Sequence, residues 1–330
     1  MEEIKFNQIG VSFKGSGSYV PNQILTNDKI SNKVDTSDEW IKSRTGISQR
    51  RISGVGENVS EMGYEAALSA IKMTKWNVET IDLIVLATST PNDLFGSAPA
   101  IQSKLGAHNA VAFDLTAACS GFLFSLVTAC QYLKGGNFKR AIVIGADQLS
   151  SYVDWNDRRS CILFGDGAGA IAIEATNKFD NLMGFKMRTD GDRGSFLNLP
   201  SKNDKDLIID NISYSSGGFS SIQMNGQEVY KFAISEVPEI INALFKKTNC
   251  DSVQVDWLLL HQANQRILDA VGERLNISSD KILSNLRDYG NTSAATIPLL
   301  LDESIRDKKI KKNDLIVLSG FGAGLSWSSA

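Results

Sequence analysis

Two pairs of apolar segments recur along the chain at one spacing, and this repeat limits the fold more than any other feature. Asp82–Leu86 resembles Asp256–Leu260, and Ala141–Gly145 resembles Leu315–Ser319. Each pair is separated by 174 residues, from 82 to 256 and from 141 to 315. Short apolar runs behind polar or basic segments are typical of strands that are buried on both faces. The equal offset at two places therefore indicates a duplicated unit.

Each half also carries a helical pattern, over about residues 121–133 in the first half and 294–306 in the second. Strands that alternate with helices predict an α/β fold built in layers. The same offset aligns Cys119 with Ser293. A pseudo-twofold axis would then bring Cys119 and the segment Asn291–Ser293 together in one cleft.

Length, composition and charge exclude several classes of protein. The 330 residues suit two domain-sized units, and 42% hydrophobic with 22% charged residues fit a soluble globular protein. A net charge of −3 without a strong basic region argues against general nucleic-acid binding. No apolar stretch approaches the ~20 residues of a transmembrane helix, so no membrane association is expected. Four scattered cysteines without metal-binding spacing, and no signal-peptide core at the N-terminus, favour a cytoplasmic protein without a metal site.

Cys119 lies where a strand pattern gives way to a helix pattern, within Asp114–Phe122. A thiol at a helix N-terminus meets unpaired N–H groups, and their field should lower the cysteine pKa from about 8.5. Small neighbouring side chains leave room for a substrate to reach the sulfur. The alternative is that Cys119 is only a small buried hydrophobic residue.

Two polar residues follow strand or turn signals in the second half. His261 ends the apolar run Asp256–Leu260, at the strand end where α/β folds collect ligands. Asn291 follows Gly290, so it could also be a simple turn residue. An imidazole N–H and an amide N–H can both donate to one oxygen, which suits a developing enolate. Because thiol proteases also combine Cys, His and Asn, these three residues alone leave the reaction open.

The glycine-rich segment Phe164–Ala170 could be mistaken for a dinucleotide-binding loop. Its spacing is GxGxG rather than GxGxxG, so an NAD site is rejected. We expect these glycines to allow tight packing between layers.

The chain resembles the β-ketoacyl-acyl carrier protein synthase III family, the condensing enzymes that start type II fatty-acid synthesis. The resemblance runs from Gly10 to Ala330. It rests on these motifs: Asp35–Trp40, Arg44–Ile47, Ala118–Gly121, Phe164–Gly169, His261–Asn264, Gly290–Ser293 and Gly320–Gly324. It implies the thiolase fold, with two duplicated βαβαβ-type halves in a five-layered αβαβα arrangement, as a homodimer. We place the half that carries the cysteine at residues 1–176 and the half that carries the histidine and asparagine at residues 177–330.

The resemblance also implies a mechanism. Cys119 would attack a short acyl-CoA, with acetyl-CoA as the expected primer, and His261 and Asn291 would hold the thioester carbonyl of malonyl-acyl carrier protein while CO2 leaves. Phe321 would crowd the malonyl carboxylate. Backbone N–H groups at Cys119 and near Ala323 would bind each oxyanion. CoA enters as a thioester substrate, so no cofactor is expected.

Substrate-binding residues follow from the same resemblance. It assigns these residues to CoA: Trp40, Arg44, Arg158, Gly226 and Asn264. It assigns a basic patch for the acidic carrier protein to Lys231, Arg266 and Arg274, which the neighbouring Glu273 makes thinner than in some relatives. Phe95 matches a residue that closes the acyl pocket of the dimer partner, where a bulky ring favours acetyl over longer primers.

Other proteins of the same fold were weighed by their residues. Chain-elongating synthases need a second active-site histidine where this chain has Asn291, and thiolases need a second cysteine that Gly320–Gly324 lacks. Plant-type polyketide synthases share the three residue types but are usually longer. A starter-unit ketosynthase of secondary metabolism remains an alternative. A non-catalytic scaffold would be expected to have lost part of the Cys119, His261 and Asn291 set.

Overall fold

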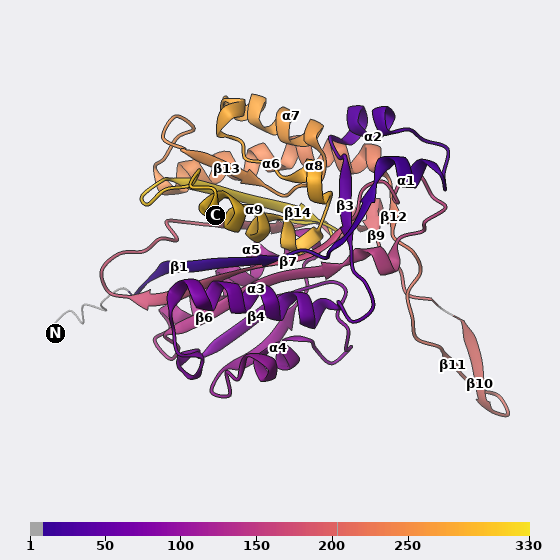
Figure 1. The fold of residues 1–330 in the computed structure, drawn as a ribbon, viewed down its shortest axis with the longest axis horizontal. Coiled ribbons are helices and arrows are strands. Elements are labelled where there is room, and N and C mark those ends of the chain that lie inside the picture. Colours follow the sequence, from indigo (N-terminus) through magenta and orange to yellow (C-terminus); the bar gives the residue numbers. More distant parts are fainter. Residues whose placement is uncertain (1–8, 203) are drawn as a thin grey trace.

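A computed structural model describes residues 9–202 and 204–330 and contains two mixed β-sheets with helices between and outside them (Figure 1). The first sheet has the strand order β1-β7-β6-β4-β5, and the second has the order β13-β14-β15-β8. The strands of the first sheet are β1 (Gly10–Tyr19), β4 (Leu83–Ala87), β5 (Val111–Leu115), β6 (Arg140–Gln148) and β7 (Asp166–Thr176). Those of the second are β8 (Lys186–Thr189), β13 (Trp257–Leu260), β14 (Ile316–Gly322) and β15 (Ser326–Ser329).

The helices form three layers around these sheets. Helices α3 (Val59–Thr74) and α4 (Ala98–Leu105) cover the outer face of the first sheet, and α6 (Gly226–Thr248) and α7 (Gln265–Leu275) cover the outer face of the second. Helices α5 (Gly121–Lys134) and α9 (Thr296–Arg306) share one core with strands of both sheets and lie between them. The predicted five-layered αβαβα thiolase-like fold is confirmed.

Strand β4 shows why the layers stack. Leu83 and Val85 pack into the central core, whereas Ile84 and Leu86 pack into the outer core with α3 and α4. Successive strand residues point to opposite faces, so a run of apolar residues without alternation must be covered on both sides. Helices α5 and α9 are apolar around most of their circumference for the same reason.

The duplication is visible in the sheets, but its spacing shifts by one residue. Leu83 of β4 lies opposite Ala141 of β6, and Trp257 of β13 lies opposite Ile316 of β14. The offset is therefore 174 residues from 83 to 257 and 175 residues from 141 to 316. The sequence-based alignment of the second strand pair was thus wrong by one residue, because an all-apolar run resembles another equally well when it slips by one position.

The turns that precede the two central helices follow the longer offset. The 3-10 turn Ala118–Ser120 precedes α5, and the 3-10 turn Ser293–Ala295 precedes α9. Their first residues, Ala118 and Ser293, have positive φ angles of 46° and 52°. Ser293 is therefore the counterpart of Ala118 rather than of Cys119, but the prediction that the two turns occupy matching points is correct.

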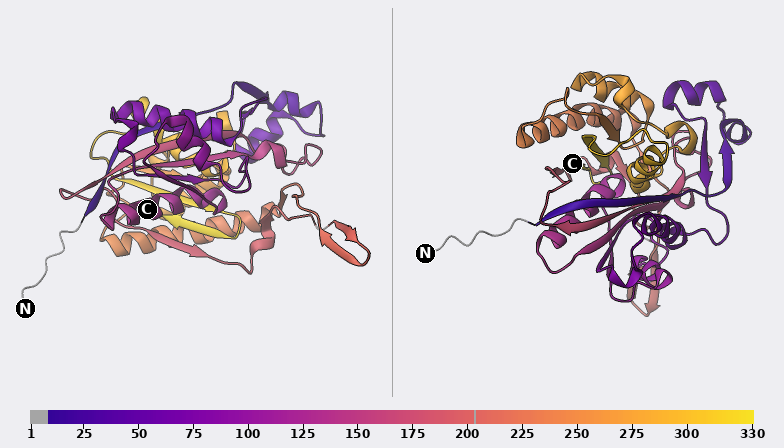
Figure 2. Two further views of the ribbon diagram at one scale, coloured as in Figure 1. Left: turned by 90° about the horizontal axis from the view of Figure 1, so that it is seen from below. Right: turned by 60° about the vertical axis from the view of Figure 1, so that its left-hand side comes forward.

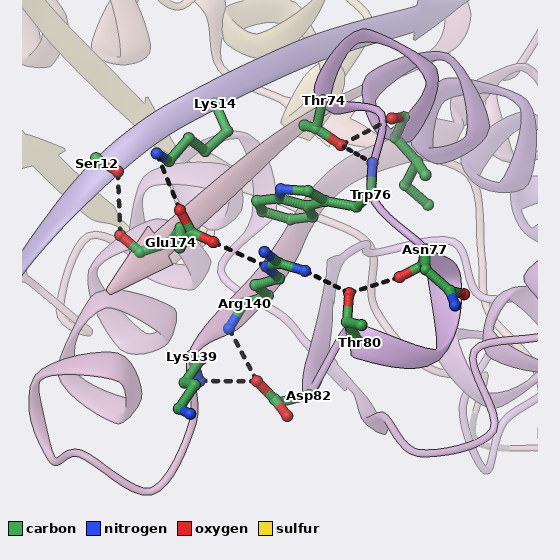
Figure 3. Close-up of polar contacts among 11 residues, drawn as sticks. Ser12, Lys14, Thr74, Trp76, Asn77, Thr80, Asp82, Lys139, Arg140 and Glu174 are labelled. Carbon is green, nitrogen blue, oxygen red and sulfur yellow. Dashed lines mark hydrogen bonds and ion pairs between the residues drawn. The ribbon is translucent and has the colours of Figure 1, made fainter. Parts of the chain in front are cut away.

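A polar cluster closes the end of the first sheet away from these turns (Figure 3). Glu174 on β7 pairs with Lys14 and Arg140, and the Arg140 guanidinium lies 4.9 Å from the ring centroid of Trp76. Asp82 accepts hydrogen bonds from the backbone N–H groups of residues 139 and 140. The cluster ties β1, β6 and β7 to the segment that leads into β4.

Two excursions leave the layered body. The first contains β2 (Gln23–Thr26), α1 (Asn27–Ser31), α2 (Asp38–Thr45) and β3 (Gln49–Ile52). The second contains β9 (Leu197–Asn198), β10 (Lys205–Ile209), β11 (Ile212–Ser215) and β12 (Gln223–Met224). Strands β9 and β12 pair at its base, and the β10–β11 hairpin projects from the body in every view (Figures 1 and 2). The short helix α8 (Leu286–Tyr289) precedes the second turn.

The glycine-rich segment packs between layers as predicted. A Cβ atom at Gly165 would lie 2.4 Å from the carbonyl oxygen of Tyr289, and one at Gly169 would lie 2.5 Å from the backbone nitrogen of Leu299. Only glycine permits these approaches, and they hold the segment before α9 against β7.

Candidate active site

Cys119 lies in the 3-10 turn between β5 and α5, at the strand–helix junction predicted from the sequence. The turn meets the end of β14, where a Cβ atom at Gly322 would lie only 2.6 Å from the Cys119 nitrogen. The thiol is buried, with a relative exposure of 7%. Its hydrogen-bond partner is the hydroxyl of Ser293, which donates to the Cys119 Sγ atom over 3.3 Å.

Burial overrides the expected effect of the helix on the thiol. Desolvation raises the pKa of Cys119 to about 12, and the nearby Asp147 carboxylate raises it further, whereas the hydrogen bond from Ser293 lowers it. The sequence-based expectation of a lowered pKa is therefore wrong for the empty site. A charge in a low-dielectric cavity loses more hydration energy than a single helix terminus returns.

His261 follows β13 directly and is buried, with its Nδ1 atom 2.8 Å from the Thr296 Oγ1 atom. Burial lowers the pKa of His261 to about 3, so the ring is neutral at physiological pH. The Phe321 ring packs edge-on against the imidazole, with 5.2 Å between the ring centroids. The ring can therefore accept or donate one proton through the nitrogen that Thr296 does not contact.

Asn291 is fixed at both its backbone and its side chain. Its N–H donates to Leu163 O over 2.9 Å, and its carbonyl accepts from Gly165 N–H over 3.0 Å. The Oδ1 atom accepts from the N–H of Ser293 over 2.8 Å. Because the amide oxygen is occupied in this way, the Nδ2 group is left to donate to a substrate oxygen.

One narrow cavity of about 100 Å³ joins the three side chains. Six residues chosen from the sequence line it, namely Cys119, Gly226, His261, Asn264, Asn291 and Phe321. The other lining residues were missed, namely Leu163, Phe164, Leu197, Met224, Val229, Tyr230, Ala263, Ile267 and Gly322. Ala323 is not among the lining residues. The sequence held no signal for Leu197 and Met224, which reach the cavity only because β9 pairs with β12.

The other expected CoA-binding residues lie outside this cavity, on the surface beside it. Trp40 and Arg44 are exposed on α2, and the Arg158 guanidinium lies 5.6 Å from the Trp40 ring centroid. Asn264, which lines the cavity, donates from Nδ2 to the carbonyl oxygen of Arg44 over 3.1 Å. The structure therefore connects the Trp40 surface to the cavity through Asn264.

The expected carrier-binding cations are exposed on α6 and α7. Arg266 lies 5.5 Å from the ring centroid of Tyr230, a residue that lines the cavity. Lys231 pairs with Glu228 over 2.7 Å, and Arg274 donates to a backbone carbonyl of α6. Two of the three cations therefore already have a partner on α6 in the free protein.

Phe95 points away from the cavity of its own chain. Its side chain is 97% exposed, and the neighbouring Leu94 is 81% exposed. Strand β5 is an edge of the first sheet, and its first residue, Val111, is 52% exposed. The structure thus leaves these apolar residues uncovered within one chain.

Within the described ranges, no helix is both long enough and apolar enough to cross a lipid bilayer. The same residues include no group of three His, Cys, Asp or Glu side chains that could hold a metal ion. All four cysteines carry free thiols.

Comparison with known proteins supplies independent findings. Residues 113–191 match the family model 3-oxoacyl-[acyl-carrier-protein] synthase III, and residues 245–330 match the model of its C-terminal part. A β-ketoacyl-[acyl-carrier-protein] synthase III of Prochlorococcus marinus strain MIT 9312 is 79% identical over 330 residues, which cover 100% of this chain and 98% of the relative.

Solved structures agree with these sequence matches. The crystal structure of 3-oxoacyl-[acyl-carrier-protein] synthase III from Aquifex aeolicus VF5 has a TM-score of 0.89 at 39% identity, covering 97% of this chain and 98% of that one. The priming β-ketosynthase of the R1128 polyketide pathway also has a TM-score of 0.89, at 29% identity, covering 97% and 95%.

Proposed function

The chain belongs to the 3-oxoacyl-[acyl-carrier-protein] synthase III family, and we propose that Cys119, His261 and Asn291 carry its acyltransferase reaction. That reaction condenses an acyl-CoA with malonyl-acyl carrier protein and starts type II fatty-acid synthesis. The observation that supports this assignment is that all three side chains line one cavity, although they come from three separate segments. A nucleophile, a neutral imidazole and an oriented amide are the groups that the two half-reactions need.

In the first half-reaction the Cys119 sulfur attacks the thioester carbonyl of the acyl-CoA. Its proton passes to the unprotonated nitrogen of the neutral His261 ring, which the low pKa of this group keeps available. The carbon–sulfur bond to CoA then breaks, and CoA leaves as a thiol with that proton. The acyl group remains on Cys119 as a new thioester.

In the second half-reaction malonyl-acyl carrier protein enters the same cavity. His261 and Asn291 donate to its thioester oxygen, the bond to the carboxylate breaks, and CO2 leaves while its electron pair forms an enolate. The apolar ring of Phe321, packed against His261, disfavours the malonyl carboxylate and so favours its loss. The enolate carbon attacks the acyl-cysteine, and the Cys119 thiolate leaves the β-ketoacyl product.

For the CoA nucleotide we propose the surface beside the cavity. The flat Trp40 ring suits an adenine, and the guanidinium groups of Arg44 and Arg158 suit the nucleotide and its phosphates. Gly226 and Asn264 line the cavity next to this surface and suit the pantetheine arm. Backbone N–H groups of Cys119 and Ala323 remain our proposal for the oxyanion site.

For the acidic carrier protein we propose docking on α6 and α7, through Lys231, Arg266 and Arg274. Arg266 is the residue best placed for this role, because it contacts Tyr230 at the cavity. Exposed charges of this kind guide association more than they add affinity.

We further propose a homodimer that pairs along the β5 edge. An uncovered edge strand with exposed apolar neighbours is a ready surface for a second copy. In that dimer Phe95 would close the acyl pocket of the partner, which favours acetyl-CoA as primer. The division of the chain at residues 176 and 177 is proposed on similar grounds, since β7 ends the first sheet at Thr176 and β8 belongs to the second. Free thiols on all four cysteines support a cytoplasmic location.

The starter-unit alternative is less well supported. The priming β-ketosynthase has the same fold but only 29% identity, against 79% for the fatty-acid synthase III relative. Turnover of a panel of acyl-CoA primers with malonyl-acyl carrier protein tests the choice. Formation of acetoacetyl-carrier protein from acetyl-CoA supports the proposed function, and turnover restricted to longer or branched primers would contradict it.

A further inference from the structure

Ser293 contacts the active-site set through three different groups. Its hydroxyl donates to the Cys119 sulfur over 3.3 Å, and its N–H donates to the Asn291 Oδ1 atom over 2.8 Å. Its carbonyl accepts from the Thr296 hydroxyl over 3.0 Å, and that hydroxyl contacts His261 Nδ1 over 2.8 Å. One residue thus connects a cysteine from one half of the molecule with the histidine and asparagine of the other.

We propose that Ser293 is a positioning residue that holds all three catalytic side chains in register and stabilises the Cys119 thiolate. This inference rests on the proposed function of the site. Ser293 need not touch a substrate for this role, because it acts through the atoms of Cys119, Asn291 and Thr296.

The backbone at Ser293 makes the three contacts simultaneous. Its φ angle of 52° lies in the left-handed region, which is unfavourable for residues other than glycine, asparagine and aspartate. This conformation is held from the first half of the molecule, because the Ala294 N–H donates to the buried Asp147 carboxylate over 3.1 Å. Strand β6 approaches closely as well, since a Cβ atom at Gly145 would lie 2.2 Å from the Ala294 carbonyl oxygen. Strain of this kind persists where the surroundings fix the conformation, and it is concentrated at functional sites.

The hydroxyl of Ser293 has a chemical role that a purely structural serine lacks. A hydrogen bond to sulfur favours the thiolate over the thiol, so it opposes the effect of burial on Cys119. The same hydroxyl also lowers the pKa of Asp147, so its single proton is shared between two acceptors. The titratable groups around the sulfur are Asp147 on β6 and His261 after β13, and Ser293 contacts or lies next to the contacts of both.

A substitution that removes only the hydroxyl tests the proposal. Ser293→Ala should slow alkylation of Cys119 by iodoacetamide roughly 10-fold or more at neutral pH, the usual effect of losing a hydrogen bond to a charged group. The plot of log rate against pH should move to higher pH by about one unit, since one unit of pKa is a tenfold change. The measurement follows the Cys119 peptide by mass spectrometry and needs no acyl substrate.

Two further variants separate the hydroxyl from fold and strain. Ser125→Ala is the matched control, because Ser125 is a buried serine of α5 whose hydroxyl has no hydrogen-bond partner. It should alkylate as the unaltered protein does. Ser293→Gly relieves the left-handed backbone but also lacks the hydroxyl, so it should show the same alkylation defect even if Ser293→Ala folds poorly.

Acylation by acetyl-CoA is measured in parallel and should fall with alkylation. Unchanged alkylation profiles in both Ser293 variants, or an equal shift in Ser125→Ala, would overturn the role of Ser293. Failure of the unaltered protein to accept any acyl group, with the alkylation difference intact, would instead overturn the proposed function and leave the effect of Ser293 on the thiol established.

Discussion

The Nδ1 atom of His261 lies 2.8 Å from the Oγ1 atom of Thr296, and no acidic side chain holds this buried imidazole. A hydroxyl can donate to Nδ1 or accept from it, whereas a carboxylate can only accept. The first half-reaction needs an unprotonated Nε2 atom that takes the thiol proton, and the second needs an Nε2–H that donates to the malonyl thioester. Thr296 satisfies Nδ1 in both protonation states of the ring.

Thr296→Val should therefore impair turnover more than substrate binding. The valine side chain has nearly the same shape but leaves the buried Nδ1 atom without a partner, which typically costs 1–3 kcal/mol, or roughly 10- to 100-fold in rate. Steady-state kinetics should show this loss in kcat with KM for acyl-CoA little changed. Thr296→Ser keeps the hydroxyl and should restore most of the rate; a serine variant as slow as the valine variant would argue against the hydrogen bond.

Cys119→Ser should abolish acyl transfer, because a hydroxyl without activation is a far poorer nucleophile than a thiolate at neutral pH. Intact-mass spectrometry after mixing with acetyl-CoA should show one added acetyl group on the unaltered protein and none on the variant. Cys130→Ser is a useful control, since Cys130 is a buried cysteine of α5 outside the cavity. Acetylation that survives in Cys119→Ser would place the nucleophile elsewhere.

His261→Ala and Asn291→Ala should affect the second half-reaction more than the first. Both side chains are proposed to donate to the enolate oxygen, and losing one such donor typically costs about 10²–10³-fold. Acetylation of Cys119 and release of CO2 from malonyl-acyl carrier protein can be followed separately. If either variant loses both half-reactions to the same extent, the assigned role of that residue is wrong.

Phe95→Ala should broaden the range of primers. In the proposed dimer this exposed ring fills the end of the partner's acyl pocket, so its removal leaves room for a longer chain. The ratio of turnover with octanoyl-CoA to turnover with acetyl-CoA should rise, while reactivity of Cys119 with iodoacetamide stays constant. Faster use of octanoyl-CoA than of acetyl-CoA by the unaltered protein would itself contradict the proposed pocket.

The stability of the protein should depend on the ionisation of His261. Its pKa is about 3 in the folded state against 6.5 ordinarily, so between these values the unfolded chain binds a proton that the folded chain does not. Stability from this group is present above pH 6.5 and is lost as the pH falls towards 3, by up to about 1.4 kcal/mol per pH unit.

Urea unfolding between neutral pH and about pH 5 measures this effect. The free energy of unfolding should fall less steeply in His261→Gln than in the unaltered protein. His108→Gln is the control, because His108 is the second histidine of the chain and is exposed. Equal slopes in the unaltered protein and His261→Gln would show that the buried ring does not titrate as described.

Much of the fold could be predicted because its signals are local. The apolar runs at Asp82–Leu86 and Asp256–Leu260 predicted β4 and β13 to within one residue, and the helical pattern at 121–133 predicted α5. The one-residue slip between 141 and 316 could not be detected, because the strand register depends on pairing with β4 and β13 rather than on the run itself. Register is a property of two strands together.

The candidate site divides in the same way. Residue type and position at a strand or helix end singled out Cys119 and His261. Leu197 and Met224 carry no such signal, since they reach the cavity only through the β9–β12 pair. Phe95 matched a family position, but its exposure has meaning only with respect to a second chain.

By itself, the sequence determined the order of strands and helices, the duplication and the nucleophile at a strand–helix junction, since each depends on neighbours along the chain. The tertiary structure decided the protonation of that nucleophile and its contact with Ser293. Burial by both halves outweighs the field of one helix, and loss of solvent depends on every segment that packs around the sulfur.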